Sequence, residues 1–508
     1  MLNRCPLLFY RSMRFKFILL LIMVVLALRA DAEKVYDFNS TCQQAFQEIT
    51  KLKLARGIAL VEKAKQQNPD NLIPVLLEDY IDFFILFFNE DPTEYKNRNP
   101  HFAERIALLE DGPKNSPFYH FCLSTVRIHK AAVSVKFGQT WSAGWDFRKA
   151  YLLLKENQKK HPDFLPNQLM SGALIAAIGT IPSSYKWIVS LFGMKGSITE
   201  GMNLVRNFTY SNDPWAKIYA NESAFVYGYL MFYIENKKDE ALAFVQQRKL
   251  DLVHNHLLCF MAANLAINNK QTAIAGSWIQ NRDKSPEYLI TPVWDFEMGF
   301  VKLYHLELPE AIKHLEQYQK DFKGRFYVKD AYNKLSLAYY LQGNQTAATA
   351  TRNKILKYGA LDTDADKKAQ KDAKTNFWPN PLLLKARLLN DGGYHKEALS
   401  ILYGKSIEQF NTEEDRLEFT YRVARIYDDL GRKDDAIKYY QTAIVLGEHR
   451  KEYYASRAAL QIAQIYEERG QKALAITYYQ KCLNMDDHEY KDSIDQRAKS
   501  GISRCKGE

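Results

Sequence analysis

The 508-residue chain has little cysteine, proline and glycine, with 6, 16 and 23 residues of each type. No two cysteines form a CxxC pair, which excludes a zinc knuckle, a thioredoxin-type motif and a dense disulfide framework. The sequence also lacks a P-loop, a GxSxG elbow, an HExxH motif and an EF-hand loop. We therefore expect a non-enzymatic protein with no catalytic residues, no cofactor and no metal. Paired catalytic carboxylates among the 59 acidic residues stay open as an alternative.

Charge of one sign is also scarce. The formal net charge is +10, and it falls to +6 without residues 1–32, which carry five basic residues and one acidic residue. No basic arm or arginine-rich helix is present, so nucleic acid binding is not expected. Mixed, solvated helix faces account for this composition, and a weak preference for acidic partners is the alternative.

A long hydrophobic run occurs only near the N-terminus. Residues 17–28 are apolar, basic residues precede them, and Ala30-Asp31-Ala32 follows. A run of about a dozen residues is shorter than the roughly 20 that span a bilayer. The pattern predicts a cleaved signal peptide over residues 1–32 and a periplasmic or secreted protein, associated with the cell envelope in one version of this hypothesis. We expect no transmembrane span in the mature chain; an uncleaved N-terminal anchor is the alternative.

Two segments near the C-terminus share one spacing of small and aromatic residues. The first is Ala424, Tyr427, Gly431, Ala436, Tyr440 and Ala443, and the second is Ala463, Tyr466, Gly470, Ala475, Tyr479 and Cys482. This spacing is typical of the tetratricopeptide repeat (TPR), a helix pair in which the glycine closes the first helix. Such a pair buries its apolar face only by stacking on neighbours, so the sequence predicts an all-α, TPR-like solenoid built from antiparallel helix pairs.

The rest of the chain fits a degenerate array of the same kind. We expect divergent helical repeats over residues 33–215 with an irregular insertion near 179–200, a TPR array over 216–485, and a capping helix or tail over 486–508. The polar segment 92–100, with prolines at both ends, is predicted to be a loop. The charged segment 362–375 is predicted to be an exposed linker or an extended helix end.

One region resembles a particular family. It contains Gly172, the run 179–182 (GTIP), Trp187, the run 191–193 (LFG), and the runs 195–197 (KGS) and 200–201 (EG). These residues resemble the landmark of the eukaryotic tetratricopeptide-repeat-39 and inclusion-body-clearance family. The resemblance implies the TPR fold and a non-enzymatic binding role. The signal peptide departs from that family, whose members act in the cytosol or at the mitochondrial surface.

In TPR arrays the first helix of each pair lines a concave groove, so positions counted from the small residue locate a candidate binding surface. The candidate groove residues are Asn380, Arg387, Asn390, Tyr421, Arg425 and Asp428. Arg387, Tyr421 and Arg425 form a row that can bind a carboxylate or a peptide backbone. A solvated face with local salt bridges is the alternative, and the adjacent Asp428-Asp429 pair is explained equally well by turn and capping chemistry.

The function that these patterns favour is an exported scaffold or adaptor that binds a protein or peptide partner in its groove. The alternative is a helical-repeat envelope protein that binds a small molecule or a glycan through surface tryptophans. The tryptophans proposed for that role are Trp187, Trp278, Trp294 and Trp378.

Overall fold

The computed structural model describes residues 33–180, 193–375 and 377–507. These residues are helical apart from turns and connections, and the extended pairing among them is one isolated bridge between Val35 and Asn71. The predicted all-α class is confirmed. The signal peptide expected over residues 1–32, and residues 181–192 of the expected insertion with Trp187 among them, lie outside the described part of the chain.

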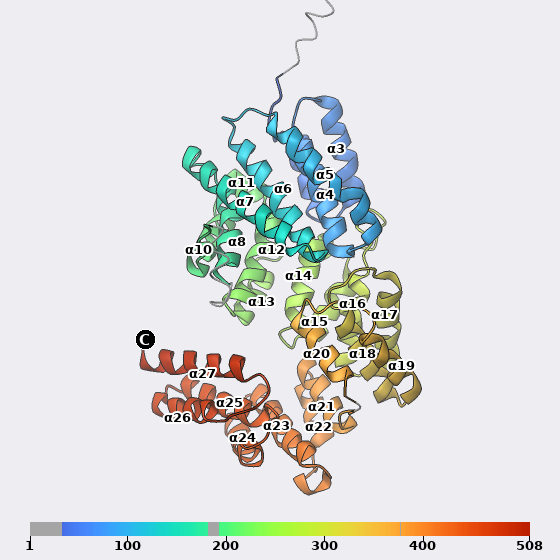
Figure 1. The fold of residues 1–508 in the computed structure, drawn as a ribbon, viewed down its shortest axis with the longest axis vertical. Coiled ribbons are helices and arrows are strands. Elements are labelled where there is room, and N and C mark those ends of the chain that lie inside the picture. The colour runs from blue at the N-terminus through green and yellow to red at the C-terminus, as the bar shows by residue number, and fades with distance from the viewer. Residues whose placement is uncertain (1–32, 181–192, 376, 508) are drawn as a thin grey trace, which may run out of the picture. The chain divides into compact units, whose positions relative to one another are not determined.

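The described residues form two compact units, coloured by residue number in Figure 1. The first unit holds residues 33–87, 93–180, 193–227 and 285–289. The second holds residues 88–92, 228–284 and most of the chain from Ile290 onward. The main division falls within one helix, after Tyr227.

The first unit is built from helices in chain order. They are α2 (Ser40–Ile49), α3 (Leu54–Gln67), α4 (Ile73–Asn89), α5 (Pro92–Glu110), α6 (Pro117–Lys136), α7 (Thr140–Lys160), α8 (Pro166–Gly179), α10 (Ile198–Thr209), α11 (Pro214–Ile218) and α12 (Ala220–Tyr229). Consecutive helices associate as pairs: α2 with α3, α6 with α7, and α8 with α10. Side-chain caps begin several of them, as when Ser197 accepts a hydrogen bond from the backbone N–H of Glu200.

The predicted loop at 92–100 is wrong, because α5 begins at Pro92 and runs through Pro100. A proline at the start of a helix removes only a backbone N–H that has no partner there. Pro100 lies in the interior, where it removes a helical hydrogen bond. Tertiary ion pairs hold this turn on α4: Asp82 binds Arg98 at 2.5 Å and Arg105 at 2.6 Å. Proline content alone could not reveal those contacts.

A buried polar cluster joins α4, α6 and α12 in the first unit. His129 Nδ1 lies 2.6 Å from Asp79 Oδ2, and the Tyr80 hydroxyl donates to both carboxylate oxygens of Glu222 at 3.1 Å. Burial raises the pKa of Glu222 to about 7. Aromatic rings surround these groups, with the Phe83 ring stacked on His129 at 4.1 Å between centroids. The cluster therefore acts as a cross-link between helices.

Two glycines let α8 and α10 approach closely. A Cβ on Gly172 would lie 2.8 Å from the Gly201 carbonyl oxygen, and one on Gly201 would lie 2.5 Å from the Ala176 nitrogen. Any larger side chain would separate these backbones. Both glycines belong to the landmark that carries the family resemblance.

The second unit continues the pairing with a short π-helical segment (Leu230–Ile234) at the end of α12. Its helices are α13 (Lys238–Gln247), α14 (His256–Ile267), α15 (Thr272–Asn281), α16 (Val293–Tyr304), α17 (Leu308–Asp321), α18 (Val328–Gln342), α19 (Gln345–Ile355), α20 (Asp364–Ala373), α21 (Pro381–Gly392), α22 (His395–Leu402), α23 (Glu413–Asp429), α24 (Lys433–Gly447), α25 (Tyr454–Glu468), α26 (Lys472–Leu483) and α27 (Lys491–Lys506). Each pair packs within itself and against the next, as α24 does against α25 and α26 against α27. This stacking confirms the predicted solenoid.

The segment 362–375 is neither an exposed linker nor the extended end of α19. It forms the separate helix α20, which packs on α18. Asp366 is fully buried and accepts hydrogen bonds from the backbone N–H groups of Tyr327, Lys329 and Asp330 at 2.9–3.1 Å. Its carboxylate thus caps the N-terminus of α18 from another helix. The cap explains why so charged a segment is ordered against its neighbour.

The turn predictions at Gly431 and Gly470 are confirmed. Their φ angles are 76° and 72°, in the left-handed region that glycine adopts without strain. Five cysteines, at positions 42, 122, 259, 482 and 505, are buried free thiols. Among the described helices, none combines the length and apolarity needed to cross a membrane.

Candidate functional site

The candidate groove residues lie on two first helices of the second unit. Asn380 caps α21, while Arg387 and Asn390 lie within it; Tyr421, Arg425 and Asp428 lie on α23. The structure brings Asn390, Arg425 and Asp428 into one polar network and places Tyr421 beside it. Asn380 stands apart at the start of α21, where it accepts from the backbone N–H of Leu382 at 3.0 Å and donates to Asp415 at 3.2 Å.

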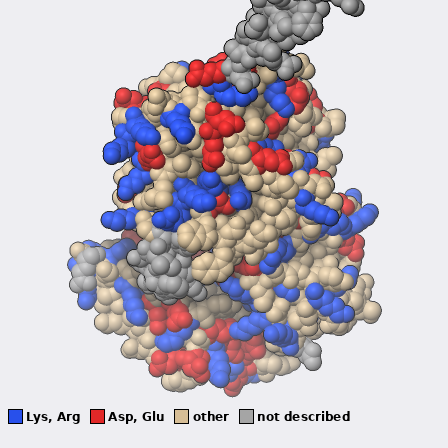
Figure 2. Space-filling model, turned by 45° about the horizontal axis from the view of Figure 1, so that its top comes forward, with Lys and Arg blue, Asp and Glu red and all other residues tan. Residues whose placement is uncertain are grey.

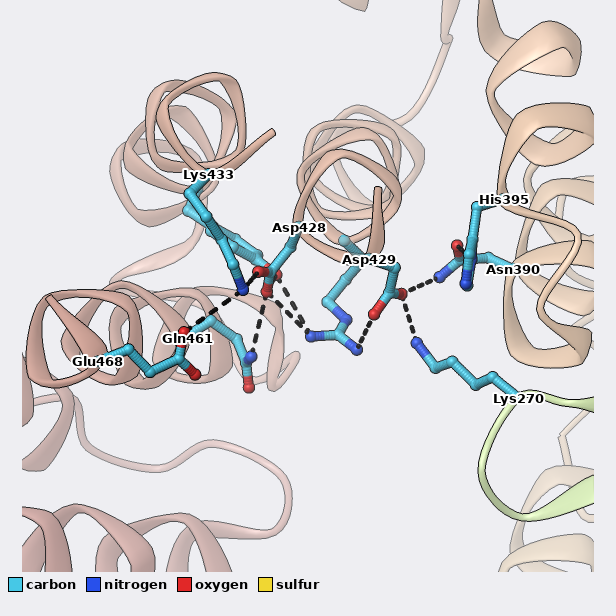
Figure 3. A network of polar contacts seen from close by, with 10 residues as sticks. Lys270, Asn390, His395, Asp428, Asp429, Lys433, Gln461 and Glu468 are labelled. Carbon is cyan, nitrogen blue, oxygen red and sulfur yellow. Dashed lines mark hydrogen bonds and ion pairs between the residues drawn. The ribbon is translucent and has the colours of Figure 1, made fainter. Parts of the chain in front are cut away.

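Asp429 lies at the centre of one half of the network (Figure 3). Its carboxylate forms an ion pair with Lys270 and accepts a hydrogen bond from Asn390 Nδ2 at 2.7 Å. Arg425 Nη2 lies 3.5 Å from its other oxygen. Burial alone would raise the pKa of Asp429, but Arg425 and Lys270 hold it below its usual value. Burial and the neighbouring Arg425 lower the pKa of Lys270, so its ammonium depends on Asp429 for compensation.

Asp428 organises the other half, also drawn in Figure 3. Lys433 donates to it at 2.7 Å, the Tyr440 hydroxyl at 3.0 Å and Gln461 at 3.4 Å. Arg425 bridges the halves, with Nη1 3.4 Å from Asp428. The pKa of Arg425 is raised despite its burial, because Tyr440, Tyr421 and both aspartates favour its charge.

This network corrects the turn-and-cap explanation of Asp428 and Asp429. Both residues lie in the last turn of α23, and no side chain caps the following helix α24. The two carboxylates instead join α21, α23, α24 and α25 to the turn after α14. At the same turn, Thr272 donates to the Gly392 carbonyl at 2.7 Å, and Gly393 sits so close that a Cβ would lie 1.9 Å from the Lys270 carbonyl oxygen. Asn390, Arg425 and Asp428 are therefore bound up in holding the helix pairs together.

Tyr421 and Arg387 differ from those three. Tyr421 is only 4% exposed, and its ring packs against Tyr454 and Tyr453 with centroids 5.1 and 6.0 Å away. Arg387 is half-buried, and within the described ranges it makes no hydrogen bond or ion pair. It lies near Glu418, whose pKa is lowered, against the effect of burial, by Arg422 and then by Arg387. Of the predicted row, Arg387 is the member available to a partner without loss of an internal contact.

The tryptophans of the glycan hypothesis do not form an open stacking surface. Trp294 is buried, with Arg282 4.4 Å from its ring centroid. Trp378 stacks on Tyr340 at 4.7 Å and has Arg352 4.4 Å from its centroid. These rings stabilise the contacts between helices through aromatic and cation–π interactions.

Charged side chains of both signs share the surface. On the face in Figure 2, Lys and Arg side chains are interspersed with Asp and Glu side chains. Such mixed charge is unlike the continuous basic surface of a nucleic-acid-binding protein. The described residues contain no group of three or more His, Cys, Asp or Glu side chains placed to hold a metal ion.

A family model described as tetratricopeptide repeat matches residues 417–445 and 456–488. These are the helix pairs α23–α24 and α25–α26, with their left-handed glycines and buried small residues. The chain carries two tetratricopeptide repeats. None of the curated proteins compared with this chain matches it in sequence.

Two solved structures align with most of the chain. The TPR domain of P58(IPK) is 14% identical, covering 82% of this chain and 95% of that one, with a TM-score of 0.23. A chain from the APC/C hetero-tetramer Cut9–Hcn1 is 13% identical, covering 89% and 92%, with a TM-score of 0.24. At these TM-scores the alignments add nothing to the fold, which rests on the helix pairs themselves.

Proposed function

We propose that the protein is an exported, non-enzymatic scaffold whose TPR array binds a protein or peptide partner along its first helices. The observation that carries the proposal is the pair of tetratricopeptide repeats at 417–445 and 456–488. Repeats of this kind present a row of side chains from successive first helices, an arrangement suited to an extended partner. The half-buried Arg387, which has no internal ion pair among the described residues, lies on the first helix just before them.

The proposal includes a relation to the tetratricopeptide-repeat-39 and inclusion-body-clearance family. The close approach of α8 and α10 at Gly172 and Gly201 supports it, because the landmark glycines have a packing role that other residues could not fill. The family's place in the cell does not follow from this relation.

Binding is tested by crosslinking and affinity capture from the cells that make the protein. The variant Arg387→Ala should recover about tenfold less of the specific partner than wild type, since a charged hydrogen bond contributes on the order of 1.5–3 kcal/mol. The matched control is Lys438→Ala, an exposed cation on the second helix α24. Equal recovery by Arg387→Ala and wild type would remove α21 from the binding surface.

Export has its own test. Mass spectrometry of the N-terminal peptide from the mature protein should find a chain that begins near Glu33. A retained residue 1–32 segment would replace the cleaved signal by the anchor.

A further inference from the structure

Tyr421 is a buried residue whose hydroxyl group has no hydrogen-bond partner in the described part of the chain. The residue is 4% exposed, and its ring is fixed between Tyr440, Tyr453 and Tyr454. A tyrosine hydroxyl in such a setting normally finds an acceptor, because an unmade hydrogen bond costs free energy. The hydroxyl of Tyr421 is therefore a donor that awaits an acceptor from outside the chain.

Arginine side chains surround that hydroxyl. Burial raises the pKa of Tyr421, while Arg425, Arg457 and Arg422 act against the rise, which places their guanidinium groups nearby. Arg422 is neutralised by Glu418 at 2.7 Å, and Arg425 by Asp428 and Asp429. Arg457, on α25, makes no ion pair or hydrogen bond among the described residues.

The last helix adds a second arginine of this kind. In α27, Ile494 and Ala498 pack in the same hydrophobic cluster as Ala458 of α25, so Arg497 projects beside that interface. Arg497 is exposed and likewise has no ion pair or hydrogen bond within the described ranges. Its pKa is lowered by burial and then by Arg457, with Arg425 adding to the effect.

A lysine from α13 completes the group. The pKa of Lys238 is lowered first by burial and then by Arg497, while Asp239 opposes the change. Lys238, Arg457 and Arg497 thus come from three helices of the second unit and repel one another. Like charges held together without a counter-ion destabilise the protein that holds them. A bound anion would remove this repulsion.

We propose that Tyr421, Arg457 and Arg497 form a carboxylate-binding site for an acidic peptide segment of the partner. A carboxylate here would accept the hydrogen bond of the Tyr421 hydroxyl and pair with both guanidinium groups. An aromatic series continues from the site, with Tyr453 5.5 Å from the half-exposed Tyr490. Rings beside the charges suit a peptide, whose other side chains pack on them, better than a free ion. The site rests on the proposed binding function and specifies its partner as acidic.

The test measures binding of a fluorescent oligoglutamate peptide to the full chain by anisotropy, with oligoglutamine and oligolysine as comparison peptides. Wild type should bind oligoglutamate selectively, and added salt should weaken binding because it screens the charges. Arg457→Gln with Arg497→Gln should weaken binding at least about tenfold, and Tyr421→Phe by less. Lys438→Gln, outside the site, should bind as wild type does.

Stability gives a second readout. Because the substitutions relieve repulsion, Arg457→Gln with Arg497→Gln should melt at a higher temperature than wild type in the absence of peptide. A lower melting temperature would overturn the site, since the arginines would then have a structural role. Equal affinity of the double variant and wild type, or equal binding of oligoglutamate and oligoglutamine, would also overturn it.

Competition separates a peptide site from an ion site and from the proposed function. Inorganic phosphate that displaces oligoglutamate at equal concentration would show a general anion site and overturn the peptide assignment. A captured partner whose recovery falls with Arg387→Ala but is unchanged in Arg457→Gln with Arg497→Gln would overturn this inference and leave the scaffold function standing.

Discussion

The two tetratricopeptide repeats contain the same internal contact in different surroundings. In the repeat at 417–445, the Tyr440 hydroxyl donates to Asp428 at 3.0 Å. In the repeat at 456–488, the Tyr479 hydroxyl donates to Glu467 at 2.5 Å. Each acid lies four residues after the small residue of its repeat, so the shared spacing reproduces the contact.

Their environments differ because their neighbours differ. The Asp428 side chain is 7% exposed and is held by Lys433 and by Arg425, which joins it to the preceding helix pair. The Glu467 side chain is 24% exposed, and its cation Arg504 comes from α27 and is 54% exposed. The position of a repeat in the array, more than its own sequence, sets how much a contact contributes to stability.

The largest effect is expected at Asp428. Asp428→Ala would leave Lys433, Arg425 and Tyr440 without their acceptor, and breaking a buried pair in this way destabilises by about 3 kcal/mol. Glu467→Ala should cost less than about 1 kcal/mol, because its cation is exposed. Urea unfolding measures both changes, with Asp434→Ala, an 81% exposed acid, as the control. Equal losses at Asp428 and Glu467 would contradict the role given to burial.

A smaller and equal effect is expected at the two turn glycines. Gly431 and Gly470 have nearly the same φ, and a Cβ at either would meet no atom within 4 Å. Alanine should therefore cost about 1 kcal/mol at each position through backbone strain alone. Thermal unfolding of the two single variants checks this. A clear difference between them would mean that array position also acts through the backbone.

The smallest effect is expected from acid on the Glu467 contact. The hydrogen bond with Arg504 is the main cause that lowers the pKa of Glu467, and Tyr479 contributes, while burial opposes them. A lowered folded-state pKa stabilises the protein above the unfolded value of about 4.3, and this gain is lost as the pH falls through the folded-state pKa. The difference in unfolding free energy between wild type and Glu467→Gln should thus be small at pH 7 and vanish in acid. Unfolding curves measured across that range would contradict the expectation if the difference grew as the pH fell.

The repeat pattern was readable because its requirements are local. Small residues where helices touch, aromatics beside them and glycine at a left-handed turn recur at fixed spacing, so the sequence located α23 to α26 and the turns at Gly431 and Gly470. The same reasoning failed at Pro100, where ion pairs to Asp82 hold an unfavourable residue inside a helix. It failed again at Asp366, whose charge is satisfied by the backbone of another helix.

The candidate surface was predicted in position more than in role. The repeat register placed Arg387, Tyr421 and Arg425 on first helices, and they lie on α21 and α23. It could not show that Asp429 takes up Lys270, 159 residues away, or that Tyr421 is buried among arginines. Arg497 was missed because α27 follows no repeat spacing. A search for cations without nearby acids on that helix would have pointed to it.

By itself the sequence determined the all-α class, the two C-terminal repeats and their turns, because helix periodicity and left-handed glycines depend on residues within about one repeat of each other. Only the tertiary structure decided which charges are neutralised within the chain and which are not. Asp428, Asp429 and Arg425 satisfy one another, whereas Arg457 and Arg497 find no partner in the described residues. That distinction depends on contacts between helices far apart in the chain, which residue spacing does not encode.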